Sequence, residues 1–191
     1  MILLFLISLI LCIVCHEFSH FVVAKIVKCP IEIISIGFGK TIFQFKHNNI
    51  LYKINMFIFG GDCQLKGERV YLKSKNAFCN LPYRKKAFIL IAGCLTNIIM
   101  GMISLLMGKI TNNYYLMYFG FVSIILGLSN LLPIPCLDGS GLIFIWLVKF
   151  SGQKKGYNLF IKINKVALKF WIVTNILSVP FIIYWLIKGL I

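Results

Sequence analysis

Long apolar runs alternate with shorter polar and basic stretches along this chain, and the alternation predicts its main elements. Four runs reach the roughly 17 to 25 residues that a helix needs to cross a bilayer: residues 2–24, 87–107, 114–148 and 170–187. The third run contains Pro133 and Pro135, and proline removes a backbone donor and clashes with the preceding helical turn. We therefore expect an all-α polytopic membrane protein with four transmembrane helices, the third broken at these prolines.

Between the first two runs, polar residues partly alternate with Ile, Phe and Tyr, which is typical of strands. Residues 34–45 and 50–61 flank the turn-like pair Asn48-Asn49, so we expect a β-hairpin. Strand backbone lies at membrane depth only where protein or a water-filled cavity covers it. The pattern predicts a small membrane-associated hairpin within a cytoplasmic region over residues 28–86. This region ends in a polar surface connector over residues 65–86.

Composition supports a membrane protein. The chain is 60% hydrophobic and 13% charged, whereas soluble domains contain about 25% charged residues. The net charge of +15 could suggest nucleic acid, but the basic residues cluster between the apolar runs and not along one soluble face. We expect one domain over residues 1–191, in contact with the lipid bilayer and not with nucleic acid.

The basic residues also predict an orientation. Residues 25–86 hold twelve of the 20 Lys and Arg residues, and residues 149–169 hold six. Because basic residues mark the cytoplasmic side, we expect a multi-pass protein of a bacterial cell membrane with both termini outside and the active site towards the cytoplasm. The first run lacks a basic leading segment and a small-residue cleavage site, which disfavours a signal peptide.

The seven cysteines do not resemble a disulfide framework, because four lie in apolar runs and three in the predicted cytoplasmic region. Cys12 and Cys15 form a C-x-x-C pair one turn from His16. A metal or redox role for this pair stays open. The favoured interpretation is two small buried side chains, since free cysteine packs as a small hydrophobe.

Two motifs place ionisable residues inside apolar runs, where a charge costs about 2.5–3.5 kcal/mol at the bilayer centre. The first motif is HEFSH, with His16, Glu17 and His20. Histidines at i and i+4 share a helix face and can share a metal ion. Glu17 is placed to take a proton from an attacking water. A histidine pair satisfied by polar neighbours in a bundle is the structural alternative, and it does not account for Glu17.

The second motif is NLLPIPCLDG, residues 130–139, which contains Asp138. Catalytic zinc takes three protein ligands, so the histidines need a third. The acidic residues besides Glu17 are Glu32, Asp62, Glu68 and Asp138. Only Asp138 lies in an apolar run. At a rise of about 1.5 Å per residue, His20 lies about 12 Å from Lys28 and Asp138 about 16 Å from Lys149. Both lysines are expected at the cytoplasmic surface, so both motifs are expected at similar depth.

In this order, the motifs resemble those of the site-2 protease family of intramembrane zinc metalloproteases, bacterial branch. HEFSH resembles the family's HExxH and NLLPIPCLDG its NxxPxxxLDG, and SIGFGKTIFQF, FGGDCQLKGE and AFCNLPYRKKAFILIAGCLTN resemble the stretches between them. The resemblance covers about residues 7–141. It implies that His16, His20 and Asp138 bind Zn2+ and that Glu17 activates the water.

For the substrate, the resemblance implies that Asn130 holds its backbone. The hairpin ending at Gly60 and Gly61 would pair with an unwound substrate strand through the edge Ile50–Gly61. Cys94 stands where the family has Pro in AGP, and Ile58 where it has Pro before Gly60. PDZ and CBS domains are not expected here, so gating would come from a regulatory membrane partner or from the spans themselves.

The expected activity is hydrolysis of peptide bonds within or near transmembrane segments of membrane protein substrates, as in regulated intramembrane proteolysis. Three alternatives stay open. One is a catalytically inactive membrane scaffold with the same motifs, and another is a metal-binding transporter or channel, since intramembrane His and Asp also mark ion pathways. The last is a zinc site completed by Glu32 or Glu68.

Overall fold

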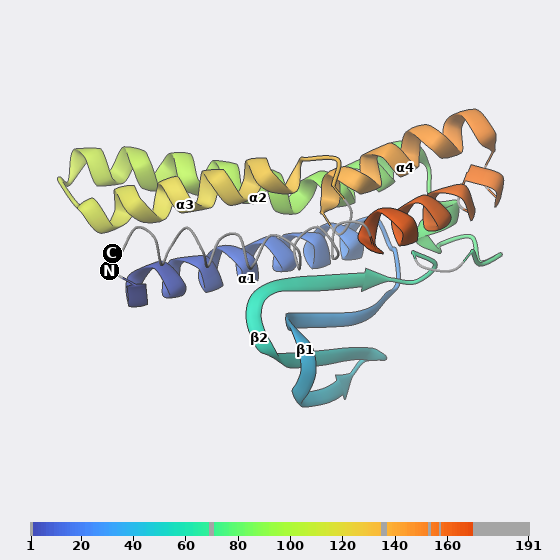
Figure 1. The fold of residues 1–191 in the computed structure, drawn as a ribbon, viewed down its shortest axis with the longest axis horizontal. Helices are drawn as coiled ribbons and strands as arrows, with labels where there is room; N and C mark the ends of the chain where they lie inside the picture. The colour runs from blue at the N-terminus through green and yellow to red at the C-terminus, as the bar shows by residue number, and fades with distance from the viewer. Residues whose placement is uncertain (1, 69–70, 135–136, 153, 157, 170–191) are drawn as a thin grey trace, which may run out of the picture.

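The computed structural model describes residues 2–68, 71–134, 137–152, 154–156 and 158–169. Its main elements, in chain order, are α1 (Ile2–Ile26), β1 (Ile31–His47), β2 (Ile50–Leu65), α2 (Tyr83–Ile110), α3 (Tyr114–Asn130) and α4 (Asp138–Ser151). Figure 1 shows α1 between the α2–α3 pair on one side and the two strands on the other, and α1 contacts all four of these elements. The helix that carries HEFSH is therefore the central element of the fold.

The predicted helices are confirmed in part. Of the described helices, α1 from Leu4 onward and α2 are long and apolar enough to cross a membrane. The predicted third span is two separate helices, α3 of 17 residues and α4 of 14 residues. The break between them falls at residues 131–137 and includes Pro133, as expected; Pro135 and the predicted span 170–187 lie outside the described residues.

Close packing of α2 against α3 depends on small residues. A Cβ atom on Gly101 would lie 2.7 Å from the Gly120 carbonyl oxygen, and a Cβ on Gly120 would lie 2.7 Å from the Gly101 carbonyl oxygen. Only glycine allows the two backbones to approach this closely, as is common in membrane helix pairs. Ser104 adds a hydrogen bond across the pair, with its Oγ donating to the Leu116 carbonyl oxygen at 2.8 Å. This interface fixes the side of α2 that faces α1.

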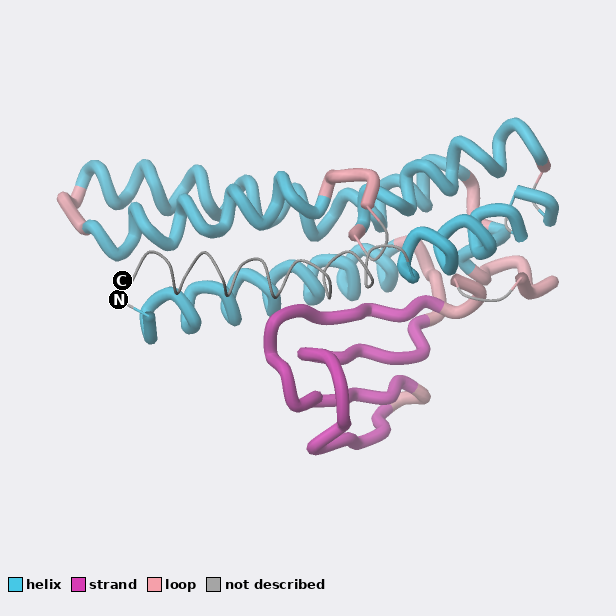
Figure 2. Tube along the Cα trace, in the orientation of Figure 1, coloured by secondary structure: helices cyan, strands magenta, loops and turns pink. Residues whose placement is uncertain are grey.

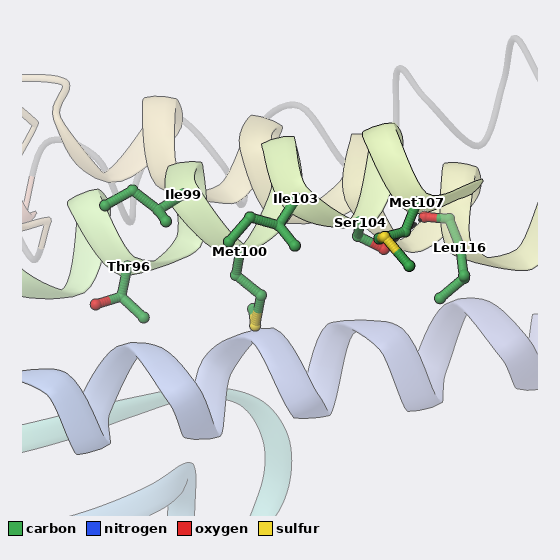
Figure 3. A pocket seen from close by; sticks show the side chains of 7 residues that line it. All are labelled: Thr96, Ile99, Met100, Ile103, Ser104, Met107 and Leu116. Atoms are coloured by element: carbon green, nitrogen blue, oxygen red, sulfur yellow. Dashed lines mark hydrogen bonds between the residues drawn. The ribbon is translucent and has the colours of Figure 1, made fainter. Parts of the chain in front are cut away.

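The outer face of α2 and α3 is apolar and exposed. An open groove of about 590 Å³ runs along α2, with Met100, Ile103 and Met107 among its lining residues and the Met100 side chain directed toward α1 (Figure 3). Exposed apolar side chains on a helical surface of this length match what hydrocarbon requires of a membrane protein. The residues that line the groove include no acid, base or histidine.

The predicted hairpin is confirmed, with β1 and β2 forming an antiparallel two-stranded sheet (Figure 2). Asn48 and Asn49 both have positive φ, 48° and 64°, which a two-residue hairpin turn requires. Both strands then bend. Gly37 and Gly39 have φ of 85° and 86°, and a Cβ on Gly37 would lie 2.7 Å from the Phe57 carbonyl oxygen. The sheet is therefore folded over and not a flat ribbon.

The bend changes which part of β2 is a free edge. Ser35 lies opposite Asp62 on one side and Lys53 on the other, so the first half of β1 lies between the two halves of β2. Residues 50–54 also pair with residues 43–47. The expected pairing edge Ile50–Gly61 is thus wrong for residues 51–54, which have a strand on both sides. The sheet edge beside α1 is residues 61–65.

The predicted polar surface connector over residues 65–86 is also corrected, because part of it belongs to the core. Among its described residues, those that are buried are Leu65, Gly67, Ala77, Phe78, Cys79, Leu81 and Lys86. Phe78 stacks on Phe144 of α4 at a centroid distance of 6.1 Å. Lys86 is fully buried, donates from Nζ to the Cys79 carbonyl oxygen at 2.8 Å and lies 5.1 Å from the Phe144 ring centroid. A buried ammonium needs such partners, and they tie the connector to α2 and α4.

Candidate functional site

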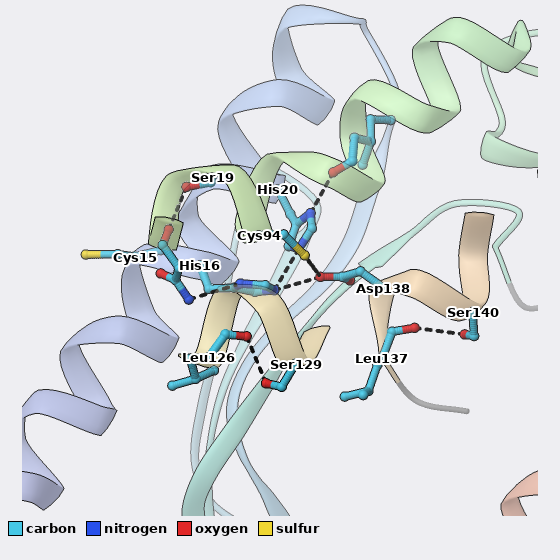
Figure 4. Close-up of polar contacts among 12 residues, drawn as sticks. Cys15, His16, Ser19, His20, Cys94, Leu126, Ser129, Leu137, Asp138 and Ser140 are labelled. Carbon is cyan, nitrogen blue, oxygen red and sulfur yellow. Dashed lines mark hydrogen bonds and ion pairs between the residues drawn. The ribbon is translucent and has the colours of Figure 1, made fainter. Parts of the chain in front are cut away.

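Two histidines of α1 point to the same spot beneath α2. His16 and His20 are one helical turn apart and are buried, with 5% and 6% of their surfaces exposed. Their Nε2 atoms lie 3.1 Å apart. Both Nε2 atoms point away from α1 toward the start of α4 (Figure 4). The helical spacing of HEFSH therefore produces a convergent pair of nitrogen donors.

Asp138 reaches this pair from the first residue of α4. Its Oδ2 lies 2.8 Å from His16 Nε2 and 3.2 Å from His20 Nε2. The break after α3 allows this approach, because it turns the chain so that a new helix begins at the site. The three side chains that the sequence predicts as zinc ligands thus lie together, and their ligand atoms are within 4.8 Å of one another. Their role as ligands stays a prediction.

Gly93 of α2 covers the histidine pair. A Cβ atom there would lie 2.5 Å from His20 Nε2 and 2.6 Å from His16 Cε1. The next residue, Cys94, is fully buried, and its Sγ donates to Asp138 Oδ2 at 3.5 Å. The thiol stands where the family has proline, so this chain places a weak hydrogen-bond donor beside the aspartate. Gly93 leaves just enough room for the two imidazole rings.

The Gly93→Ala variant is expected to lose most of its zinc, because the added methyl group would overlap both rings at the atoms that face the ligand position. Zinc content after size-exclusion chromatography measures this. Gly101→Ala is a matched control, since it crowds the α2–α3 interface away from the histidines. If Gly93→Ala folds and has the same zinc content as the wild type, the two imidazole rings do not bind zinc in the observed positions.

Glu17 and β2 meet on the other side of α1. A Cβ atom on Gly61 would overlap the Glu17 side chain, and a Cβ on Gly60 would overlap the Phe38 ring. Gly61 therefore allows the strand to pass directly beside the glutamate, and Gly60 makes room for the Phe38 ring. The sequence predicts Gly60 and Gly61 as substrate-binding residues, and the structure places them on the wall of the cavity that Glu17 also lines.

This cavity has a volume of about 890 Å³ and contains most of the chain's acidic groups. Four of the five acidic residues line it: Glu17, Asp62, Glu68 and Asp138. Asn130, at the end of α3, lines it as well, and its role in holding a substrate backbone stays a prediction. Acidic residues are scarce in this chain of net charge +15, so their gathering in one cavity indicates a functional site.

The alternative third ligands are placed differently from Asp138. Glu68 lines the cavity and accepts a hydrogen bond from the Leu65 backbone nitrogen at 2.9 Å, whereas Glu32 accepts from Gln64 Nε2 at 3.3 Å outside the cavity. Within the described residues, the His/Cys/Asp/Glu group that could hold a metal is His16, His20 and Asp138. The geometry favours Asp138 over both glutamates.

The nearby thiols are weak competitors for a metal. Cys63 lines the cavity, but burial raises the pKa of its thiol, so it is protonated and uncharged at neutral pH. Cys12 and Cys15 are free thiols, Cys12 fully buried, and neither belongs to the metal-capable group. Cys12 thus fits the favoured interpretation of a small buried side chain, whereas Cys15 is half-buried.

Two hydrogen bonds behind the histidines were missed by the sequence predictions. His20 Nδ1 donates to the Ile89 carbonyl oxygen at 2.7 Å, and the Asn97 amide lies 3.3 Å from His16 Nδ1. The available signal was Asn97 itself, a polar amide in the middle of an apolar run. An unpaired amide is costly in such a run, so a partner was to be expected.

The donor set fits zinc. Two imidazole nitrogens and one carboxylate oxygen leave a fourth position for water, as catalytic zinc sites require. The two histidines come from the HExxH sequence of α1, and the aspartate comes from the distant helix α4. Such a donor set between apolar helices is typical of the membrane-embedded zinc metalloproteases. The comparison with known proteins agrees, since the chain belongs to peptidase family M50, the site-2 protease family, whose profile matches residues 4–113 and 107–174.

Individual relatives support the family. A protein of Borreliella burgdorferi named as a zinc metalloprotease is 32% identical over 134 residues, which is 65% of this chain and 31% of that protein. Protease RseP of Photorhabdus luminescens is 46% identical over 39 residues, 20% of this chain and 17% of that protein. The matched segments thus span a third or less of these relatives.

The fold has a counterpart among solved structures. The site-2 protease from Methanocaldococcus jannaschii aligns over 94% of this chain and 70% of its own, with a TM-score of 0.58 and 21% identity. At this identity the match concerns the fold.

Proposed function

We propose that this protein is an intramembrane zinc metalloprotease that hydrolyses peptide bonds within or near transmembrane helices of membrane proteins. The observation that carries the proposal is the meeting of His16, His20 and Asp138 in one cavity, with the closest ligand atoms 2.8 Å apart. The two motifs are separated by more than a hundred residues, and α1 and α4 bring them together.

Each residue then has a role in the reaction. His16, His20 and Asp138 hold the metal ion. When bound, zinc supplies Lewis-acid chemistry, polarising the scissile carbonyl and lowering the pKa of water to about 7. Glu17 takes the proton from the attacking water on its carboxylate and passes it to the leaving amine, acting first as base and then as acid. The strand at Gly61 limits the positions that the Glu17 side chain can take.

A test needs a defined substrate. A short transmembrane helix with few flanking residues, tagged at both ends, is a suitable probe in proteoliposomes. We expect a single cleavage within or near the helix, located by mass spectrometry, that a zinc chelator stops and added zinc restores. Cleavage that continues after the chelator has removed the zinc would contradict the proposal.

The substrate has to expose backbone before it is cut. A helix hides its carbonyl groups in its own hydrogen bonds, so the substrate must unwind, and an unwound strand in a membrane needs new partners. Pairing with a free sheet edge supplies them by β-augmentation. We assign this role to the edge at residues 61–65, because it lies beside Glu17 and along the cavity. Asn130, across the cavity, would bind the backbone of the same strand.

Proline substitutions can test this edge. Proline removes a backbone donor, so a scan of residues 62–64 is expected to include positions that lose cleavage while zinc content stays that of the wild type. Gly61 is left out of the scan because a Cβ there would overlap Glu17. Proline at residues 43–46, the other outer edge of the sheet, is the control and is expected to leave cleavage intact. Equal effects of the two scans would contradict substrate pairing beside Glu17.

The proposal includes a topology of four spans. Three are α1, α2 and the broken α3–α4 unit, and the fourth is the apolar run 170–187, with both termini outside and the basic regions in the bacterial cytoplasm. Reporter fusions at each end and in residues 111–113 are expected to be active outside the cell. A fusion in residues 66–80 is expected to be active in the cytoplasm, and the reverse pattern would overturn this orientation.

A further inference from the structure

We propose that Asn97 is a positioning residue that fixes His16 in the tautomer that binds zinc, by accepting a hydrogen bond from His16 Nδ1 through its side-chain carbonyl. The inference rests on the zinc site of the proposed function. It concerns a residue of α2 that neither of the two ligand motifs contains.

His20 has the hydrogen-bond acceptor that a metal-binding histidine needs for its second ring nitrogen. Its Nδ1 lies 2.7 Å from the Ile89 carbonyl oxygen. A carbonyl can only accept, so the proton of the ring is on Nδ1 and the lone pair is on Nε2, toward Asp138. Metal-binding histidines generally donate their second ring N–H to such an acceptor, which fixes both tautomer and ring orientation.

His16 has an amide in the equivalent place. Asn97 Nδ2 lies 3.3 Å from His16 Nδ1, both side chains are buried, and Asn97 is fully so. Among the described residues, Asn97 Oδ1 is the one buried side-chain nitrogen or oxygen without a hydrogen-bond partner. A buried carbonyl oxygen without a donor is costly, and this one belongs to the amide beside the ligand.

The direction of this hydrogen bond decides whether His16 can bind a metal. If the amide NH₂ donates to Nδ1, the ring proton must be on Nε2, the atom that faces Asp138, and no lone pair is left there for a metal. Rotation of the amide by 180° exchanges its nearly isosteric NH₂ and carbonyl groups. Oδ1 then accepts from Nδ1–H, gains the donor it lacks, and leaves the Nε2 lone pair free.

The surrounding helices hold Asn97 in position for this task. Ser123 of α3 donates from Oγ to the Asn97 backbone carbonyl oxygen at 2.7 Å. A Cβ on Gly127 would lie 3.2 Å from the Asn97 Cβ, so α3 packs closely against the base of the side chain. Asn97 is also one turn beyond Gly93, on the α2 face that covers the histidines. The amide can rotate about its last bond while its position stays fixed.

Two substitutions separate this role from general packing. Asn97→Leu keeps the shape without an acceptor and is expected to weaken zinc binding by about 10-fold to 100-fold, the usual effect of losing such a partner. Asn97→Asp keeps an acceptor and is expected to retain wild-type affinity. Ser104→Ala is the matched control, because it removes a similar α2–α3 hydrogen bond far from the site. Competition with a chromogenic chelator gives the affinities.

The tautomer itself can be measured in the wild-type protein. The chain has three histidines, so selective ¹⁵N-histidine labelling gives few NMR signals, and His16→Ala assigns the one of interest. With zinc added, His16 is expected to carry its proton on Nδ1. Zinc-loaded His16 protonated on Nε2, or Asn97→Leu with the zinc affinity of the wild type, would overturn the inference. Failure of the proposed function is a separate result. It would be seen if the wild-type protein binds zinc and gives these histidine signals but cleaves no substrate.

Discussion

Asp138→Ala is expected to reduce the zinc content of the purified protein from about one ion per chain to a small residual fraction. The carboxylate is the donor that comes from α4, and its Oδ2 lies within 3.2 Å of both histidine Nε2 atoms. Two neutral imidazoles alone leave the charge of the ion without a counter-charge in a site walled by apolar helices. Metal analysis by mass spectrometry, after removal of loosely bound ions, measures the effect.

The control for this variant is Asp62→Ala. Asp62 is also an aspartate on the cavity wall, but it is not part of the metal-capable group, so its loss is expected to leave the zinc in place. Zinc that survives Asp138→Ala but not Glu68→Ala would identify Glu68 as the third ligand. Zinc that survives both single substitutions would mean that the ion binds elsewhere.

Glu17→Gln is expected to keep its zinc and to lose turnover by about 100-fold to 10,000-fold, the usual contribution of general acid–base catalysis. Glutamine has the same shape but cannot take a proton from water. Cleavage of the tagged transmembrane helix, measured beside zinc content on the same preparation, separates the two effects. Glu32→Gln, outside the cavity, is the matched control and is expected to cleave normally.

The same variant discriminates between the classes of protein that the motifs allow. An inactive scaffold predicts no cleavage by either form. If the protein is a transporter, metal flux is expected that does not depend on the proton-accepting carboxylate of Glu17. Cleavage by the wild type that persists in Glu17→Gln would remove Glu17 from the mechanism.

The helices and the hairpin could be predicted because local patterns determine them. Uninterrupted apolar runs give α1 and α2, Pro133 explains the break between α3 and α4, and Asn48 and Asn49 fit a turn that needs positive φ. The fold-over of the sheet at Gly37 and Gly39 could not be predicted. A glycine allows a sharp bend, but whether the chain bends depends on which strand is available to pair on the other side.

The site shows the same division. HEFSH is a local pattern, and Asp138 stands out because acids are scarce in apolar runs and both motifs are expected at one depth. The burial of Phe78 and Lys86 was missed, since a polar sequence gives no sign of the aromatic surface on α4 that accepts it. Asn97 was missed for a related reason. Its cost in an apolar helix indicates a partner, but only the packing of α1 against α2 shows that the partner is His16.

The distance along the chain between the ligands has a consequence for biogenesis. His20 and Asp138 are 118 residues apart, which a ribosome covers in about 6 to 24 s at 5–20 residues per second. Throughout that interval the nascent chain carries an HExxH helix without its third ligand. On the proposed ligand set, a newly made molecule cannot cut itself or a neighbouring helix until α4 has been synthesised and packed, so the order of the elements along the chain delays activity until the fold is nearly complete.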